Sequence, residues 1–374
     1  MATDPWHYPR TEFRDRVLRT LLRGGADAIT IYGPRRTGKT QFLLRDVAPE
    51  AAKSGISVVY ASFWQASEPP VTILAHALRT TLAEPGLWTR TRDAWRQMKP
   101  KLRVAPMGIG GEIDLSGGAE VGASSAQLDL DDLIGNLPAT QEKPALLLLD
   151  EIQELASEGH RGFVAGLRTS LDKRRPLIKA IFTGSNMDGL RAMFAEREAP
   201  FLAYGIQETL PPLGIEFVEH MLGAQEAATG SRADTAEAMS FLEEVDRSPY
   251  AFRRALETMS LRPGTGLREA HRLLLDEYSE RQGYNRVWAE LTVLHRLILV
   301  RLAEGSDGLT GRAALEDMAA ELREPVSKGR ISSALATLSR RNLVHKVFGK
   351  WSIQDPEFAR YLRHVERTEE GSAP

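Results

Sequence analysis

The chain has 374 residues, 42% hydrophobic and 26% charged, a composition that excludes a largely disordered protein and permits two or three packed domains. The formal net charge is -2, so contact with nucleic acid would need a local basic patch instead of an overall positive charge. The absence of cysteine excludes disulfides, thiolate catalysis and cysteine-based zinc sites.

The N-terminal residues are polar, and no apolar run of the sequence reaches the roughly 20 residues that span a bilayer. We therefore expect a cytoplasmic protein that makes no membrane contact. The first predicted element is an amphipathic helix over residues 11–23. A short apolar, β-prone run at Ala28–Tyr32 then predicts a buried strand.

Residues 33–40 read GPRRTGKT and fit the pattern of a phosphate-binding loop, G-x-x-x-x-G-K-[ST]. The predicted phosphate-contacting residues are Gly33, Pro34, Arg35, Arg36, Thr37, Gly38, Lys39, Thr40 and Gln41. The glycines let backbone N–H groups point at a polyphosphate, Lys39 would reach the β- and γ-phosphates, and the Thr40 hydroxyl would ligate Mg²⁺. A helix predicted to about residue 47 follows, and the order of strand, loop and helix favours this interpretation over an accidental glycine-rich turn.

A second strand is predicted at residues 56–62 and a helix at 71–82. Residues 99–125 differ from both, because apolar residues alternate there with polar residues and glycines. This pattern predicts a β-hairpin insertion into the surrounding domain. Two interpretations of its role stay open, a mobile surface ribbon and a contact element for a partner or for DNA.

The continuous apolar run at residues 145–149 predicts a central parallel strand that is buried on both faces. It ends in Asp150, which is placed to hold Mg²⁺, and Glu151, which is placed to orient and deprotonate an attacking water. The alternative is that these two carboxylates only cap the next helix.

A helix at residues 161–171 and a third strand at 177–183 follow. A polar residue just after this strand would lie beside the γ-phosphate; Asn186 is the first candidate and Ser185 the second, although either could instead cap the helix predicted at 188–194. A last strand is predicted at 207–210. Alternating strands and helices predict an α/β fold, a parallel sheet covered by helices on both faces, over residues 1–213.

The rest of the chain is predicted to form a helical lid over residues 214–284, a winged helix-turn-helix over 285–366 and a polar tail over 367–374. The winged helix rests on predicted helices at 288–302, 312–322 and 328–340 and short strands at 343–348 and 351–353. Basic residues gather on the third helix and the wing, where DNA phosphates would lie: Lys328, Arg330, Arg340, Arg341, Lys346 and Lys350. A protein-docking module is the alternative.

The motifs GPRRTGKT, LLLLDE, TGSN and LPPL together resemble those of the AAA+/STAND-type P-loop ATPases. The resemblance is closest to the archaeal-type branch, which is also similar to origin-recognition/initiator and transposition-regulator ATPases. It implies binding of ATP or ADP with Mg²⁺.

The resemblance also implies roles for residues outside the loop. Arg10 resembles part of the segment that packs on adenine. Pro249 resembles the proline of a Gly-x-Pro lid turn, although Arg247 stands in the place of the glycine. Arg253 or Arg254 would be a lid arginine. The Gly-Arg pair of many relatives reads Gly-Ile here, so an arginine that acts on a neighbouring subunit would be Arg197 or Arg191.

Two functions are consistent with this sequence. The first is a Mg-ATP-dependent switch that hydrolyses ATP slowly alone, self-associates with ATP and acts on duplex DNA as a loader, transposition regulator or mobile-element defence ATPase. The alternative is a STAND-type signalling switch whose winged helix docks a protein effector.

Overall fold

A computed structural model describes residues 4–363 with gaps at 65–67, 84–128, 157, 186, 196–198, 307, 348–349 and 356. The predicted hairpin insertion at 99–125 and the polar tail at 367–374 lie outside the described residues. None of the described helices is long and apolar enough to cross a bilayer.

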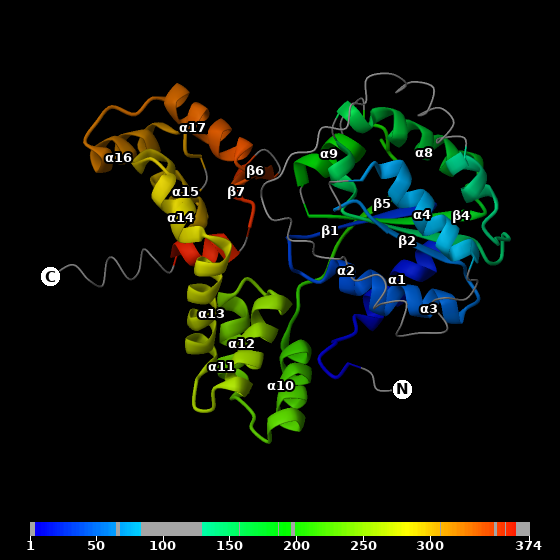
Figure 1. Ribbon diagram of the computed structural model, residues 1–374, viewed down its shortest axis with the longest axis horizontal. Helices are drawn as coiled ribbons and strands as arrows, with labels where there is room; N and C mark the ends of the chain where they lie inside the picture. The colour runs from blue at the N-terminus through cyan, green and yellow to red at the C-terminus, as the bar shows by residue number, and fades with distance from the viewer. Residues whose placement is uncertain are drawn as a thin grey trace, which may run out of the picture.

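Five parallel strands form the central sheet in the order β2-β3-β4-β1-β5, which confirms the predicted parallel sheet (Figure 1). The strands are β1 (Ala28–Tyr32), β2 (Val58–Ser62), β3 (Ala145–Asp150), β4 (Ile178–Gly184) and β5 (Ile206–Thr209). In the register of the sheet, Ser62 pairs with Asp150 and Tyr32 with Gly184. The carboxyl ends of the central strands therefore meet at one edge, where the phosphate-binding loop follows β1.

Strand β3 is buried at every position because its side chains enter two different hydrophobic cores. Leu147 and Leu149 point into one core, and Leu146 and Leu148 into the other, as the two-residue period of a strand requires. The first core is covered by α4 (Pro70–Ala83), α8 (Arg161–Lys173) and α9 (Met187–Phe194). The second is covered by α1 (Thr11–Leu22), the π-helical turn η1 (Phe42–Val47) and α3 (Ala48–Lys53).

The helix after the phosphate-binding loop is longer than predicted, because α2 (Lys39–Gln41), η1 and α3 run on without a break to Lys53. Asp46 lies in the π-helical turn and is only 3% exposed. Its carboxylate accepts hydrogen bonds from the backbone N–H of Arg10 (3.2 Å) and contacts His7 Nε2 (2.7 Å). This contact fixes the N-terminal strap, residues 4–10, across the helix.

Four helices follow the sheet and enclose a core of their own, so this region is helical as predicted. They are α10 (Ile215–Thr229), α11 (Thr235–Glu244), α12 (Pro249–Leu261) and α13 (Leu267–Gln282). Phe217, Phe241 and Phe252 form its aromatic centre, with ring centroids 5.3 and 5.8 Å apart. We call this region the lid.

The C-terminal part of the chain has a separate hydrophobic core. Its elements are α14 (Tyr284–Glu290), α15 (Val293–Ala303), α16 (Arg312–Leu322), α17 (Lys328–Arg340), the antiparallel strands β6 (Val344–Val347) and β7 (Lys350–Ile353), and a helical segment at 357–363. The single helix predicted at 288–302 is wrong. The helix breaks at Leu291, and Thr292 begins a new one by accepting a hydrogen bond from the His295 backbone N–H.

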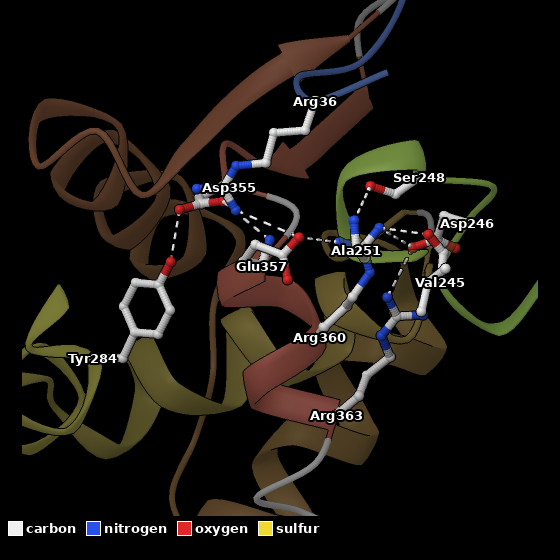
Figure 2. A network of polar contacts seen from close by, with 10 residues as sticks. All are labelled: Arg36, Val245, Asp246, Ser248, Ala251, Tyr284, Asp355, Glu357, Arg360 and Arg363. Carbon is white, nitrogen blue, oxygen red and sulfur yellow. Dashed lines mark hydrogen bonds and ion pairs between the residues drawn. The ribbon is translucent and has the colours of Figure 1, made fainter. Parts of the chain in front are cut away.

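A network of charged residues joins the phosphate-binding loop, the C-terminal part and the lid (Figure 2). Arg36 Nη1 in the loop lies 3.3 Å from Asp355 Oδ1 and 3.4 Å from Glu357 Oε1. Arg360 donates hydrogen bonds of 2.6 Å to Glu357 Oε1 and to the carbonyl oxygen of Val245 in the lid. Glu357 and Arg360 are 4% and 5% exposed. The 357–363 segment is therefore connected to the phosphate-binding loop by the ion pair of Glu357 with Arg36 and to the lid by the hydrogen bond from Arg360 to Val245.

Replacing Arg360 with methionine should lower the free energy of unfolding by about 3–5 kcal/mol, because it removes one partner of a buried ion pair. The matched control is Arg363→Met. Arg363 Nη2 lies 3.1 Å from Asp246 Oδ2, but the Arg363 side chain is partly exposed and that of Asp246 is exposed, so the control should cost about 1 kcal/mol or less. Urea unfolding followed by tryptophan fluorescence measures both unfolding free energies. Equal losses of unfolding free energy in the two variants would show that the buried Arg360 pair stabilises the fold no more than the Arg363 pair does.

Candidate functional site

The phosphate-binding loop turns between β1 and α2 with Gly38 in a left-handed conformation, at φ 96° and ψ 14°. A side chain is rarely tolerated at this φ. A Cβ on Gly38 would lie 3.8 Å from Pro249 Cγ of the lid. Pro249 therefore lies against the loop, although 211 positions separate the two residues in the sequence (249 minus 38).

Lys39 is 4% exposed, and its ammonium lies inside the loop. Nζ donates hydrogen bonds to the carbonyl oxygens of Gly33 (2.7 Å) and Pro34 (2.8 Å). Burial lowers the pKa of Lys39, while the nearby carboxylates of Glu151 and Asp150 favour its charged form. The two carbonyl oxygens carry no net charge, so the buried ammonium can still attract an anionic ligand such as a polyphosphate.

Asp150 lies at the end of β3 and is 1% exposed. Its carboxylate accepts hydrogen bonds from the hydroxyls of Thr40 (2.7 Å), Tyr60 (3.0 Å) and Thr183. Burial, followed by the charge of Glu151, raises the pKa of Asp150 above its ordinary value, and the three hydroxyls oppose that shift. Sequence reasoning missed Tyr60 and Thr183, because only strand pairing places them beside this carboxylate.

The Thr40 and Asp150 side chains fit a magnesium ion, which prefers oxygen ligands and commonly keeps several waters and substrate phosphate oxygens in its coordination sphere. Their oxygens are 2.7 Å apart. The described part of the chain contains no cluster of three or more histidine, aspartate or glutamate side chains arranged to hold a metal.

Glu151 follows Asp150 with a left-handed backbone, at φ 55°, which is uncommon for a residue with a side chain. Its Oε2 accepts hydrogen bonds from Ser185 Oγ (2.8 Å) and Gln153 Nε2 (2.5 Å). Ser185, the second candidate for the polar residue after the third strand, therefore contacts Glu151 directly. Asn186, the first candidate, lies outside the described residues.

Arg10 holds the loop against the segment after β5. Nη2 donates a 3.0 Å hydrogen bond to the carbonyl oxygen of Thr37, and Nη1 donates to that of Pro211. Burial lowers the pKa of Arg10 to about 10. Tyr8 of the same strap packs edge-on against Phe217 of the lid, with ring centroids 5.8 Å apart. A contact between this segment and adenine stays a prediction.

The lid turn accommodates arginine where a glycine was expected. Arg247 adopts φ 53°, the left-handed region that glycine favours, and its Nη1 donates a 2.9 Å hydrogen bond to the Leu213 carbonyl oxygen. The two candidate lid arginines, Arg253 and Arg254, both hydrogen-bond to Glu257 in the same helix, at 2.9 and 2.8 Å. Their contact with a nucleotide stays a prediction.

Two loop arginines stack on aromatic rings. The Arg35 guanidinium lies 4.4 Å from the Trp64 ring centroid, and that of Arg36 lies 5.0 Å from the Tyr250 ring centroid. A cavity of about 430 Å³ borders Arg35 and Trp64 on one side and Tyr284 of the C-terminal part on the other. Neither Lys39 nor Thr40 lines it, so it is distinct from the phosphate-facing interior of the loop.

Gln41, the last of the predicted phosphate-contacting residues, is exposed on α2.

The predicted DNA face carries less free positive charge than its sequence suggests. Lys328, Arg330, Arg340 and Arg341 are exposed on and just after α17. However, Arg330 Nη2 lies 2.7 Å from Glu324 Oε1, and Arg341 Nη2 lies 2.9 Å from Glu290 Oε2. The side chains of Lys346 and Lys350 lie outside the described residues.

The candidates for an arginine that acts on a neighbouring subunit are only partly described. Arg197 lies outside the described residues, and Arg191 is exposed on α9. Ile206, which replaces the arginine of the Gly-Arg pair, is 43% exposed on the edge strand β5.

Comparison with known proteins gives the fold a context. No protein-family model matches the chain, and no curated protein is significantly similar to it. The Walker-type ATPase PABY2304 of Pyrococcus abyssi superposes with a TM-score of 0.60 at 17% identity, over 96% of this chain and 99% of that one. The ADP form of the Aeropyrum pernix ORC2 protein superposes with a TM-score of 0.56 at 16% identity, over 98% and 97%. The predicted resemblance to archaeal-type ATPases and origin-recognition proteins is thus confirmed for the fold.

The buried carboxyl of Asp150 should make stability depend on pH. Because its pKa is raised, the folded chain holds this proton to a higher pH than the unfolded chain, whose carboxyl titrates near 3.8. Its stabilising contribution is present below that value and is lost as the pH rises through the folded-state pKa. The unfolding free energy of the wild type minus that of Asp150→Asn should therefore fall as the pH is raised from about 4 upward.

Urea unfolding over this range, without nucleotide or Mg²⁺, measures that difference. The control is Asp131→Asn, because hydrogen bonds from Arg174 lower the pKa of Asp131. The contribution of Asp131 to stability changes only below about pH 4, so the wild-type minus Asp131→Asn difference should stay constant over this range. A wild-type minus Asp150→Asn difference that does not change with pH would contradict the prediction.

Proposed function

We propose that this chain binds ATP with Mg²⁺ and hydrolyses it to ADP and phosphate, as a nucleotide-dependent switch of the AAA+ type. The observation that carries the proposal is the meeting of Lys39, Asp150 and Glu151 at one edge of the sheet, with the lysine and the aspartate buried. The fold shared with Walker-type and origin-recognition ATPases supports it.

Each residue of the site has a distinct part in the proposed reaction. Lys39 would bind the β- and γ-phosphate oxygens, and Thr40 with Asp150 would hold Mg²⁺. When bound, Mg²⁺ would neutralise negative charge on the phosphate oxygens. Glu151 would accept a proton from water as the water oxygen bonds to the γ-phosphorus. The bond from that phosphorus to the β–γ bridging oxygen breaks, and its electron pair stays with ADP.

Self-association with ATP is part of the proposal, because AAA+-type sites are commonly completed by an arginine of the neighbouring subunit. Arg191 and Arg197 remain the candidates. The exposure of Arg191 on α9 is consistent with such a role.

The DNA role rests on α15, α16, α17 and the β6–β7 hairpin of the C-terminal part, an arrangement that suits a winged helix. We infer that its exposed basic residues bind duplex DNA through phosphates. The pairing of Arg330 with Glu324 and of Arg341 with Glu290 favours the second candidate function, in which this part docks a protein effector of a signalling switch.

Glu151→Gln should bind ATP like the wild type and lose turnover by about 10²–10⁴-fold, because an amide cannot accept the proton of the attacking water. Fluorescent-nucleotide titration and phosphate release measure the two properties. Lys39→Ala is the comparison, since loss of the phosphate-facing ammonium should abolish binding itself. Wild-type turnover in Glu151→Gln would rule out the role given to this carboxylate.

Changing Arg340, Arg341 and Lys350 together to alanine should weaken duplex binding and flatten its dependence on salt. Each phosphate contact contributes a slope of about −0.9 in a plot of log affinity against log salt, so up to about three contacts would be lost. The control makes the same change of charge in the lid, at the exposed residues Arg232, Arg262 and Arg268. If the wild type and both triple variants give identical DNA-binding isotherms at every salt concentration, the result would favour docking of a protein partner by the C-terminal part.

A further inference from the structure

Gln153 is a buried polar residue that the proposed reaction does not yet use. It lies in the 3₁₀ turn η2 (Ile152–Ala156) directly after the carboxylate pair and is 6% exposed. Its Nε2 donates hydrogen bonds to Glu151 Oε2 (2.5 Å) and Glu154 Oε1 (3.2 Å), and its Oε1 accepts one from the backbone N–H of Ser185 (3.3 Å). One side chain thus joins the ends of strands β3 and β4.

The surrounding backbone leaves room for this side chain and little else. A Cβ on Gly184 would lie 2.6 Å from Gln153 Oε1, and a Cβ on Gly189 would lie 2.7 Å from Gln153 Cβ. Real Cβ atoms do not approach other atoms so closely, so glycine at both positions is what admits the glutamine. Gly184 of β4 therefore lies against the amide oxygen of Gln153, and Gly189 of α9 lies against its Cβ.

The hydrogen bonds that the Glu151 carboxylate accepts all go to one of its two oxygens. Gln153 and Ser185 both donate to Oε2, and among the described residues no donor hydrogen-bonds to Oε1. The carboxylate is fixed by one oxygen, and the other remains available to accept a proton. The left-handed backbone of Glu151 makes such support necessary, because that conformation is disfavoured for a residue with a side chain.

We propose that Gln153 is the positioning residue for Glu151 in ATP hydrolysis. It holds Oε2 through its amide N–H and so directs Oε1 toward the attacking water. Through its own Oε1 it ties this geometry to the end of β4, where Ser185 completes the arrangement. The inference rests on the proposed ATPase function. It assigns Gln153 no contact with nucleotide, so its loss should affect the chemical step and leave binding unchanged.

The test replaces Gln153 with methionine, which has a similar length and volume and no hydrogen-bonding amide. Gln153→Met should lower kcat about 10- to 100-fold, because misplacing the carboxylate by about 1 Å is enough for such a loss. KM and the dissociation constant for ATP should stay within about twofold of the wild type. The matched control is Gln225→Met in α10, which removes an equally buried glutamine, 3% exposed, far along the chain from β3.

A second variant keeps the test decisive if methionine prevents folding. Gln153→Asn keeps an uncharged amide that fits the same space, but its side chain is one methylene shorter, so its N–H should no longer reach Glu151 Oε2. We expect kcat to fall about 10-fold or more while KM stays within about twofold of the wild type. If Gln153 has only a packing role, the unfolding midpoint should fall and kcat should stay at the wild-type value.

The outcomes separate the two proposals. An inactive wild type would overturn the ATPase function itself. The role of Gln153 alone would be overturned if the wild type hydrolyses ATP, Glu151→Gln does not, and both Gln153→Met and Gln153→Asn keep the wild-type kcat. A loss of kcat at constant KM in the Gln153 variants, with Gln225→Met unchanged, would support it.

Discussion

The site depends on the removal of one carboxylate from water. Asp150 ends a strand that is buried on both faces, and it is stabilised there by three hydroxyls and a nearby ammonium instead of by solvent. Each of these partners comes from a different element of the sheet or from the phosphate-binding loop. The Asp150 carboxylate has all of its hydrogen-bond partners only when strand order, register and loop conformation are correct. The contacts that form the fold therefore also form the site.

Much of the sheet and the core of the site could be predicted because the relevant signals are local. The run at 145–149 alternates between two hydrophobic cores, so it had to be apolar throughout, and the loop motif is a contiguous octapeptide. Tyr60, Thr183 and Gln153 were missed for the opposite reason. Their partners are set by strand pairing and by the space that Gly184 and Gly189 leave, which no short window of sequence contains.

The C-terminal part shows two further limits of sequence reasoning. An apolar run across residues 288–302 predicts one helix, yet a threonine within it caps a second helix once the chain turns. The sequence also does not show which basic residues near α17 are paired with carboxylates. Glu324, just before the helix, pairs with Arg330, and Glu290 of α14 pairs with Arg341, a contact that only the folded chain brings together.

The network around Arg36 also has a mechanical meaning (Figure 2). Its backbone belongs to the loop that would surround a polyphosphate, while its guanidinium is attached to carboxylates near the opposite end of the chain. Arg360 carries the same connection on to the lid. A pulling force applied to the C-terminal part would therefore be transmitted to the loop backbone through the ion pairs of Arg36 with Asp355 and Glu357. The phosphate-binding loop is therefore mechanically coupled to the C-terminal part of the chain.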